Sequence, residues 1–229
     1  VFYVSTASHA SDSNPGTSPS APWRTLSRAS IGMGTGCSLL LNAGSVWKDD
    51  LLQLHALTDV LVGSYSSSQE PGGVVQKQRP VVGGNGTEHS VLVRLVDMEN
   101  FEMRDLELCN AEMAVILGYT SPSRYRNVTF ANIYAHDLMN PNYGPQDLYM
   151  GGFIYVGGLP PLTVSDPLPV LSALTVRNSH FLRTDLILAT GMNAPSYNLA
   201  NFSQFLTLNT LSFSRNTIHN CSFLSLFLC

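Results

Sequence analysis

Residues 2–26, FYVSTASHASDSNPGTSPSAPWRTL, decide the fold of this chain. A short aromatic strand, Phe2 to Ser5, is followed by a turn built almost wholly from Ser, Asp, Asn, Pro and Gly. These residue types hydrogen-bond their own backbone or adopt the dihedral angles that tight turns need. Trp23 comes next and is large enough to cover the open end of a core. This order predicts the start of a solenoid, in which residues 1–36 form a cap with one strand and a short helix.

Internal repetition extends this prediction along the rest of the chain. From about residue 100 a two-strand unit recurs, with an alternating segment followed about eleven residues later by a short apolar run. Aligning the alternating segments on Met103, Phe130, Val176 and Phe213 places apolar residues five positions later, at Leu108, Ala135, Phe181 and Ile218. We expect the four anchors to stack as inward residues of one parallel sheet.

The other apolar runs are also those of strands. Each is four to six residues long, rich in Val and Leu, and bounded by Gly, Asn or Pro. A doubly wound α/β sheet is excluded because no amphipathic helix lies between them to make the crossovers. An antiparallel sandwich is the alternative, but it would need hairpin turns, and Asn85-Gly86 lies in a Gly-rich turn instead.

The strand, the SDSNPGT turn and the PW-x-TL segment resemble the opening of right-handed parallel β-helix proteins of the pectate-lyase-like superfamily. Ala10 stands where that family usually has Gly. The resemblance implies an all-β, right-handed parallel β-helix. We expect coils over residues 37–229, with loop insertions at about 139–169 and 193–205 where the repeat is interrupted. It also implies a secreted protein that acts on acidic polysaccharides. The apolar end of the chain and the small number of coils predict a fragment that lacks C-terminal coils.

Composition narrows the function classes. The chain has 12 Lys and Arg against 16 Asp and Glu, a net charge of −4, so it carries no basic excess for nucleic acid. No apolar run approaches the roughly 18 residues that a membrane helix needs. The four cysteines are too widely spaced for a metal-binding or redox motif, and we expect buried thiols. Four Asn-x-Ser/Thr sequons suit a secreted chain.

Register predicts columns of polar residues, because stacked coils place equivalent positions above one another. Two positions after the anchors come Asp105, Asn132, Asn178 and Arg215, a candidate side-chain ladder at a corner. The columns four, six and seven positions after the anchors bring titratable groups to one outer face. The candidate catalytic residues in these columns are His136, Asp137, His180 and Arg183, and Asp185 beside them and Arg177, one position after an anchor, complete the set.

A lyase acting on a uronic-acid polymer needs a cation for the carboxylate, a base and an acid. We expect calcium as the cofactor, held by Asp and Glu oxygens that the sequence does not single out. The superfamily uses a Lys or Arg base, and here the lysines, Lys48 and Lys77, precede the well-formed coils. The base of a lyase would therefore have to be Arg177, Arg183 or His136. No cluster of aspartates like that of the family's hydrolases is visible.

Two insertions interrupt the repeat and would border the same groove. Their aromatic residues are candidates for sugar stacking: Tyr143, Tyr149, Tyr155 and Tyr197. We therefore expect a monomeric, secreted polysaccharide lyase-like protein, with hydrolase or uronate epimerase as other enzymatic readings. A non-catalytic β-helix module for glycan binding or adhesion is the alternative from another class.

Overall fold

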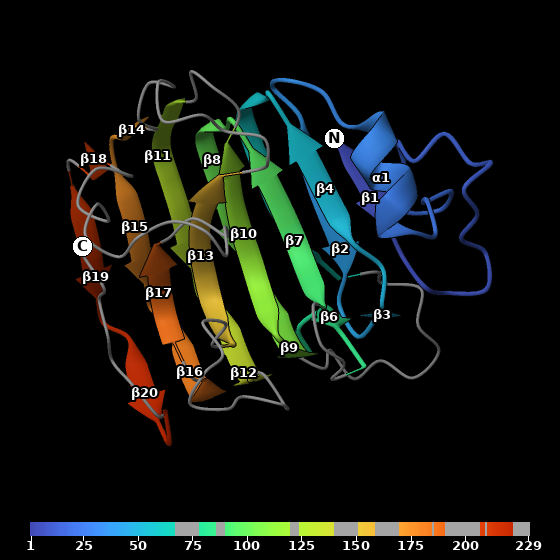
Figure 1. Cartoon of the computed structure of the whole chain (residues 1–229). Helices are drawn as coiled ribbons and strands as arrows, with labels where there is room; N and C mark the ends of the chain where they lie inside the picture. The colour runs from blue at the N-terminus through green and yellow to red at the C-terminus, as the bar shows by residue number, and fades with distance from the viewer. Residues whose placement is uncertain are drawn as a thin grey trace.

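The computed structural model describes residues 1–66, 78–85, 90–119, 124–139, 151–158, 170–184, 186–190, 207–208 and 210–221. It is mostly β, with one helix and three parallel sheets among these residues. Each pairing of these strands is parallel and joins one coil to the next (Figure 1). This arrangement fits a β-helix or solenoid-like fold and excludes the antiparallel sandwich.

Sheet A has nine strands and carries the anchor residues. Its strands are β1 (Phe2–Val4), β2 (Ser38–Asn42), β5 (Thr58–Tyr65), β8 (Glu99–Arg104), β11 (Arg124–Ala131), β14 (Val170–Leu171), β15 (Leu174–Arg177), β18 (Thr207–Leu208) and β19 (Leu211–Ser214). Met103, Phe130, Val176 and Phe213 are direct neighbours in successive strands, as the alignment predicted.

Sheet B has six strands and follows sheet A in each coil. Its strands are β3 (Val46–Lys48), β6 (Val81–Gly83), β9 (Glu107–Ala111), β12 (Tyr134–Leu138), β16 (His180–Thr184) and β20 (Thr217–His219). The second predicted column, from Leu108 through Ala135 and Phe181 to Ile218, is also in register.

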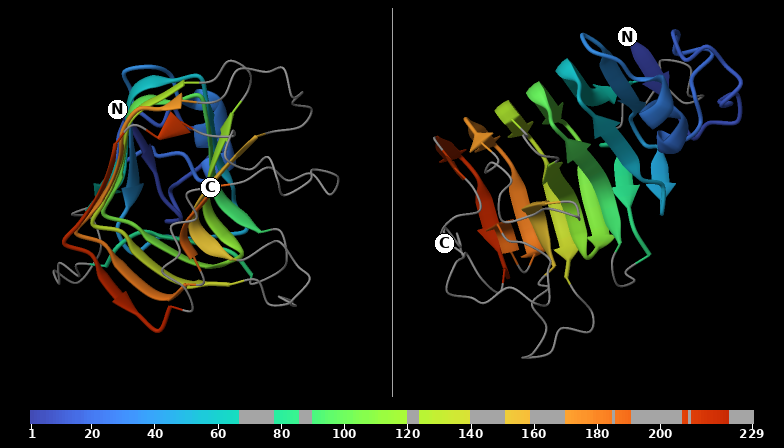
Figure 2. Two further views of the ribbon diagram at one scale, coloured as in Figure 1. Left: turned by 60° about the vertical axis from the view of Figure 1, so that its left-hand side comes forward. Right: turned by 45° about the horizontal axis from the view of Figure 1, so that its top comes forward.

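Sheet C has five strands and closes the coil. Its strands are β4 (Leu52–His55), β7 (Val91–Val96), β10 (Met113–Tyr119), β13 (Gly152–Gly158) and β17 (Leu186–Thr190). The left view of Figure 2 shows the three sheets as walls around a common interior, and the right view shows the coils stacked from the N-terminal end. The repeat therefore has three strands, and the predicted two-strand unit is wrong.

The missed strand boundary is a corner in the middle of each alternating segment. Asp105, Asn132, Asn178 and Arg215 all have φ between 52° and 62°, the left-handed conformation that Asn and Asp tolerate better than most residues. The chain turns there from sheet A to sheet B. Asn132 donates its amide to Asp105 Oδ1 at 2.6 Å, which is one step of the predicted ladder.

A second ladder of the same kind runs along the other end of sheet A. Asp59, Asn100 and Asn127 have φ of 56°, 51° and 51°. Asn100 donates to Asp59 Oδ1 at 2.9 Å, and Asn127 donates to Asn100 Oδ1 at 2.8 Å. Stacked amides thus satisfy polar groups at positions where the backbone bends.

The interior is a continuous apolar core with a line of aromatic rings. Successive ring centroids from Phe101 through Phe130, Phe153 and Phe181 to Phe213 lie 6.3, 5.4, 5.0 and 6.0 Å apart. The first four rings are fully buried, whereas Phe213 in the last described coil is 38% exposed. Aromatic packing therefore links all three walls of the coil.

The N-terminal cap forms as the opening stretch predicts. Trp23 is 1% exposed, stacks on Phe2 with centroids 4.6 Å apart, and donates its indole N–H to the Asn14 carbonyl at 2.9 Å. Gly16 has φ of +72°, and a Cβ there would lie 2.4 Å from the Trp23 ring. The Gly in the turn is thus required both by its dihedral angle and by the tryptophan that covers the core.

Helix α1 (Leu26–Gly32) completes the cap. Thr25 is its N-cap and accepts a hydrogen bond from Arg28 N at 3.0 Å. Asp12 accepts from the backbone N–H of Arg24 and of Thr25, both at 2.9 Å, and from the Thr25 hydroxyl at 2.8 Å. Burial opposes ionisation of Asp12, but these hydrogen bonds outweigh it and lower its pKa.

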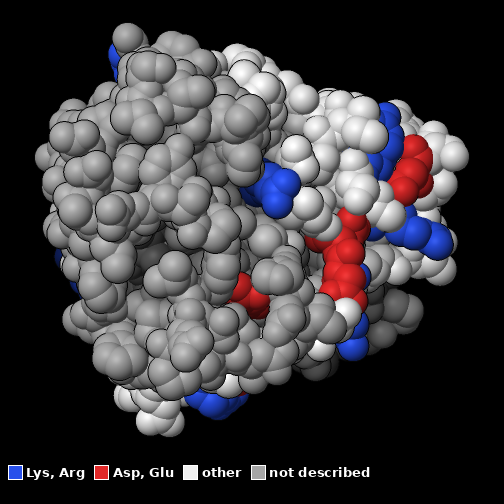
Figure 3. All heavy atoms as spheres, viewed as in Figure 1, with Lys and Arg blue, Asp and Glu red and all other residues white. Residues whose placement is uncertain are grey.

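Among the residues that the structure describes, no helix has both the length and the apolar character that crossing a bilayer requires. Figure 3 shows Asp and Glu side chains beside Lys and Arg side chains over the N-terminal coils of the face in view.

Candidate functional site

The candidate site lies on the outer face of sheet B. Leu108, Ala135 and Phe181 are fully buried and point inward. Because side chains alternate along a strand, their neighbours point outward. The outward set in the middle of this sheet is Glu107 and Cys109 on β9, Tyr134 and His136 on β12, and His180 and Leu182 on β16.

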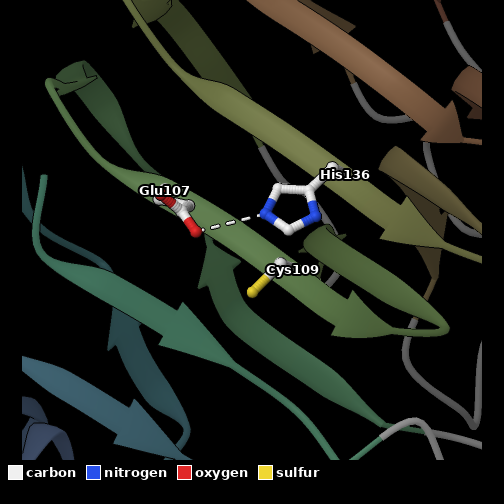
Figure 4. A group of neighbouring side chains, drawn as sticks. All are labelled: Glu107, Cys109 and His136. Atoms are coloured by element: carbon white, nitrogen blue, oxygen red, sulfur yellow. Dashed lines mark hydrogen bonds and ion pairs between the residues drawn. The ribbon is translucent and has the colours of Figure 1, made fainter.

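His136 is the centre of this face. Its Nδ1 lies 2.7 Å from Asp137 Oδ2, and its Nε2 lies 3.1 Å from Glu107 Oε1. Cys109 is the direct neighbour of His136 in the adjacent strand, so its sulfur belongs to the same group (Figure 4). One imidazole thus faces two carboxyl groups and one thiol.

The surroundings of His136 favour its charged form. The pKa of His136 is raised to about 9. The largest cause is a hydrogen bond with the Cys109 side chain, which raises the pKa, and burial of the ring lowers it by less. Hydrogen bonds with Asp137 and Glu107 raise the pKa further. The imidazole is therefore protonated at neutral pH when the cluster holds no metal.

Asp137 and Arg183 occupy a corner of the coil and form a two-point ion pair. Their φ angles are 53° and 49°, so both lie in the left-handed region at the same point of successive coils. Arg183 Nε and an Nη donate to the two oxygens of Asp137 at 2.5 and 2.8 Å. The Arg183 hydrogen bond lowers the pKa of Asp137 to about 2, against the opposing effect of burial and with help from His136. Asp137 is therefore a firmly ionised carboxylate.

Rings form a row beside this charged group. Tyr134 lies 4.6 Å from the His136 ring and 5.3 Å from the His180 ring, and His180 lies 5.5 Å from His219. His180 Nε2 is buried and makes no hydrogen bond within the described part of the chain. The face therefore joins flat rings to charged hydrogen-bonding groups.

The structure brings four of the predicted catalytic residues together, places Arg177 elsewhere and does not describe Asp185. His136, Asp137, His180 and Arg183 share the outer face and corner of sheet B. Arg177 lies on sheet A, 3.5 Å from Glu102 Oε1, because the chain turns between Arg177 and His180. Asp185 lies outside the described residues.

The predicted aromatic residues of the groove are mostly untested. Tyr155 lies half-buried on β13 of sheet C, which is a different wall from the charged cluster. Tyr143, Tyr149 and Tyr197 lie outside the described residues, as do residues 140–150, 159–169 and 193–205 of the two predicted insertions.

Glu107 and Cys109 belong to the cluster around His136 but were not among the predicted catalytic residues. Both stand in the polar columns that the register defines, so the repeat alignment was the signal that could have found them. The expectation of buried, unpaired thiols holds for Cys109, which is free and buried, whereas Cys37 and Cys221 are free but half-buried.

Calcium does not fit this cluster. Over the described residues, the group of three metal-ligating side chains that the structure brings together is Glu107, Cys109 and His136. Calcium takes six to eight oxygen ligands, whereas this group offers one sulfur, one nitrogen and one carboxylate. A calcium requirement remains a prediction without residues assigned to it.

The stacked parallel sheets and the polar outer wall define the class as a β-helix-like protein, and the solved structures agree. The crystal structures of GH136 lacto-N-biosidase from Eubacterium ramulus, native and selenomethionine, match 94% and 95% of this chain with TM-scores of 0.65 and 0.67. Sequence identity is 18% in both, so the likeness concerns the fold.

A sequence relative carries the same name. The lacto-N-biosidase of Bifidobacterium longum subsp. longum is 32% identical in an alignment 98 residues long, and the match covers 39% of this chain and 6% of that protein. This chain spans 40–41% of the length of the crystallised proteins. No family model matches the sequence.

Proposed function

We propose that this chain is the right-handed β-helix part of a secreted carbohydrate-active protein, and that the outer face of sheet B contacts an oligosaccharide. The observation that carries the proposal is the fold likeness to lacto-N-biosidase over 94% of the chain. The right hand follows the general rule for parallel β-strand crossovers. Secretion is supported by the four sequons.

The chemistry of the face suits glycan binding. The row of Tyr134, His180 and His219 offers rings for the apolar faces of sugars, and Asp137 and Arg183 offer an acceptor and donors for hydroxyl groups at its edge. Arg183 is 48% exposed, so it is accessible to a ligand.

Hydrolysis is a better proposal than β-elimination. A lyase base must be unprotonated, but His136 has a pKa of about 9. The hydrogen bond from Arg183 to Asp137 raises the pKa of the guanidinium, so Arg183 is also a poor base. The relatives are named as a glycosidase, which accords with a hydrolase and gives a lyase no support.

A non-catalytic glycan-binding module is the second candidate, and one observation favours it. Asp137 is neutralised by both His136 and Arg183, and its low pKa makes it unable to donate a proton at neutral pH. A glycosidase normally needs one carboxylic acid as proton donor and a second carboxylate. Asp137 therefore cannot be the proton donor, and this favours binding without cleavage.

One experiment separates these readings. The chain is incubated with oligosaccharides that carry lacto-N-biose and with uronic-acid polymers, and binding, released disaccharide and ultraviolet-absorbing unsaturated product are measured. We expect binding of the neutral oligosaccharide, weakened at least tenfold by Arg183→Ala and unchanged by Arg177→Ala on sheet A. Disaccharide release supports the hydrolase, and binding without turnover supports the module. Unsaturated product, or equal loss in both arginine variants, would refute the proposal.

A further inference from the structure

We propose that Glu107, Cys109 and His136 form a zinc-type metal site on the outer face of sheet B, with a fourth coordination position left for water or a ligand. The inference stands apart from the glycan proposal, because metal binding can be measured without any sugar. It uses Cys109, a buried thiol that neither catalytic reading employs.

The donor atoms already lie close to the spacing of a coordination sphere. Sγ of Cys109, a ring nitrogen of His136 and an oxygen of Glu107 lie within 4.8 Å of one another. Tetrahedral zinc with bonds of about 2.0–2.3 Å places its ligand atoms about 3.3–3.7 Å apart. The distance from His136 Nε2 to Glu107 Oε1 is 3.1 Å, so a movement of about an ångström by the sulfur completes the triangle.

The donor types select the metal. Thiolate and imidazole are ligands of zinc and related transition metals, whereas calcium and magnesium take oxygen. Three protein ligands with one open position are the usual set of a zinc site that binds an exchangeable molecule.

A supporting group fixes the histidine in the orientation that a metal requires. His136 Nδ1 hydrogen-bonds Asp137 Oδ2 at 2.7 Å, which leaves Nε2 directed toward Glu107 and Cys109. Arg183 holds Asp137 in turn through both carboxylate oxygens. Metal-bound histidines almost always have such a carboxylate or carbonyl partner on the other ring nitrogen.

The surroundings of the sulfur also suit a thiolate ligand. Asn110 donates its amide to Cys109 Sγ at 3.5 Å, and Cys109 is 5% exposed. Gly83, on β6 of the preceding coil, pairs in register with Cys109, and a Cβ on this glycine would lie 3.4 Å from the sulfur. The glycine thus leaves space beside the sulfur that a larger residue would fill.

Cobalt titration of the chain tests the site, because Co²⁺ replaces Zn²⁺ and its bond to a thiolate gives a near-ultraviolet charge-transfer band. We expect one Co²⁺ per chain, displaced by Zn²⁺, with the band lost in Cys109→Ser. The band should persist in Cys37→Ser and Cys221→Ser, whose thiols are half-buried elsewhere. Absence of the band in the parent chain, or its persistence in Cys109→Ser, would overturn the proposal.

Further variants distinguish ligation from a structural role. Glu107→Gln and His136→Ala should each weaken zinc binding at least 100-fold, and Asp137→Asn should weaken it about 10- to 100-fold. His180→Ala, on the same face, should leave it unchanged. Urea unfolding of each metal-free variant reports folding separately. If a thiol variant fails to fold, Glu107→Gln decides, and unchanged zinc affinity in that variant refutes the site.

Discussion

Replacing Phe130 by Ala should cost about 4 kcal/mol of unfolding free energy, because the fully buried ring leaves a cavity between two neighbours. Its centroid lies 6.3 Å from that of Phe101 and 5.4 Å from that of Phe153, so the change removes two aromatic contacts. Phe213 stands in the same column but is 38% exposed, and among the described rings it contacts that of Phe181. Phe213→Ala should therefore cost about half as much.

Urea unfolding followed by circular dichroism measures both changes. A loss of about 4 kcal/mol is a large share of the roughly 5–15 kcal/mol that stabilises most domains, so Phe130→Ala should move the midpoint strongly. The parent chain and Phe213→Ala are the controls. Equal losses in the two variants, or a loss below about 1 kcal/mol for Phe130→Ala, would refute the stacked aromatic interior.

Three other substitutions test separate parts of the structure. Val176→Asp should cost about 4 kcal/mol or prevent folding, because it puts an unpaired charge at a residue that is 2% exposed, and an unchanged melting temperature would contradict its burial. Asn100→Ala should cost about 2 kcal/mol by removing two ladder hydrogen bonds and straining a positive φ, whereas Asn100→Gly should recover part of that loss in the same denaturation assay. The pKa of Asp12 is lowered on folding, so its stabilising effect is present above its ordinary pKa and is lost as the pH falls through the lower folded value. Thermal melts of the parent chain and Asp12→Ala should therefore differ at pH 7 and converge in acid; a constant difference would argue against this role.

The stacking of the coils was predictable because it depends on inward residues. The interior tolerates only apolar side chains, so the anchors repeat and their alignment gives the register of sheets A and B directly. The corners were less predictable. Asp105 and Asn132 read as polar positions within one alternating segment, and only the backbone shows that their positive φ divides it into two strands. Short polar side chains adopt that conformation, and the pattern of apolar residues in the sequence does not reveal it.

The candidate site could be predicted in part for the same reason. His136 and His180 share a face because both follow a corner by two or more residues and then alternate with buried neighbours. Arg177 precedes its corner, so it faces outward from sheet A although it is only three residues from His180. The cluster around Cys109 depends on contacts between adjacent strands, and its chemistry is not visible from cysteine spacing along the chain.

The corner from sheet A to sheet B limits where residues can be inserted into this protein. In the last four described coils it contains two residues, as in Asn132-Ile133 between β11 and β12. One added residue there would turn the buried set of sheet B outward, since alternation has a period of two. The connections from sheet C back to sheet A have different lengths, four residues at 120–123 and eleven at 159–169. Insertions and grafted peptides therefore belong at that return, where length can vary while the opposite corner keeps every coil in phase.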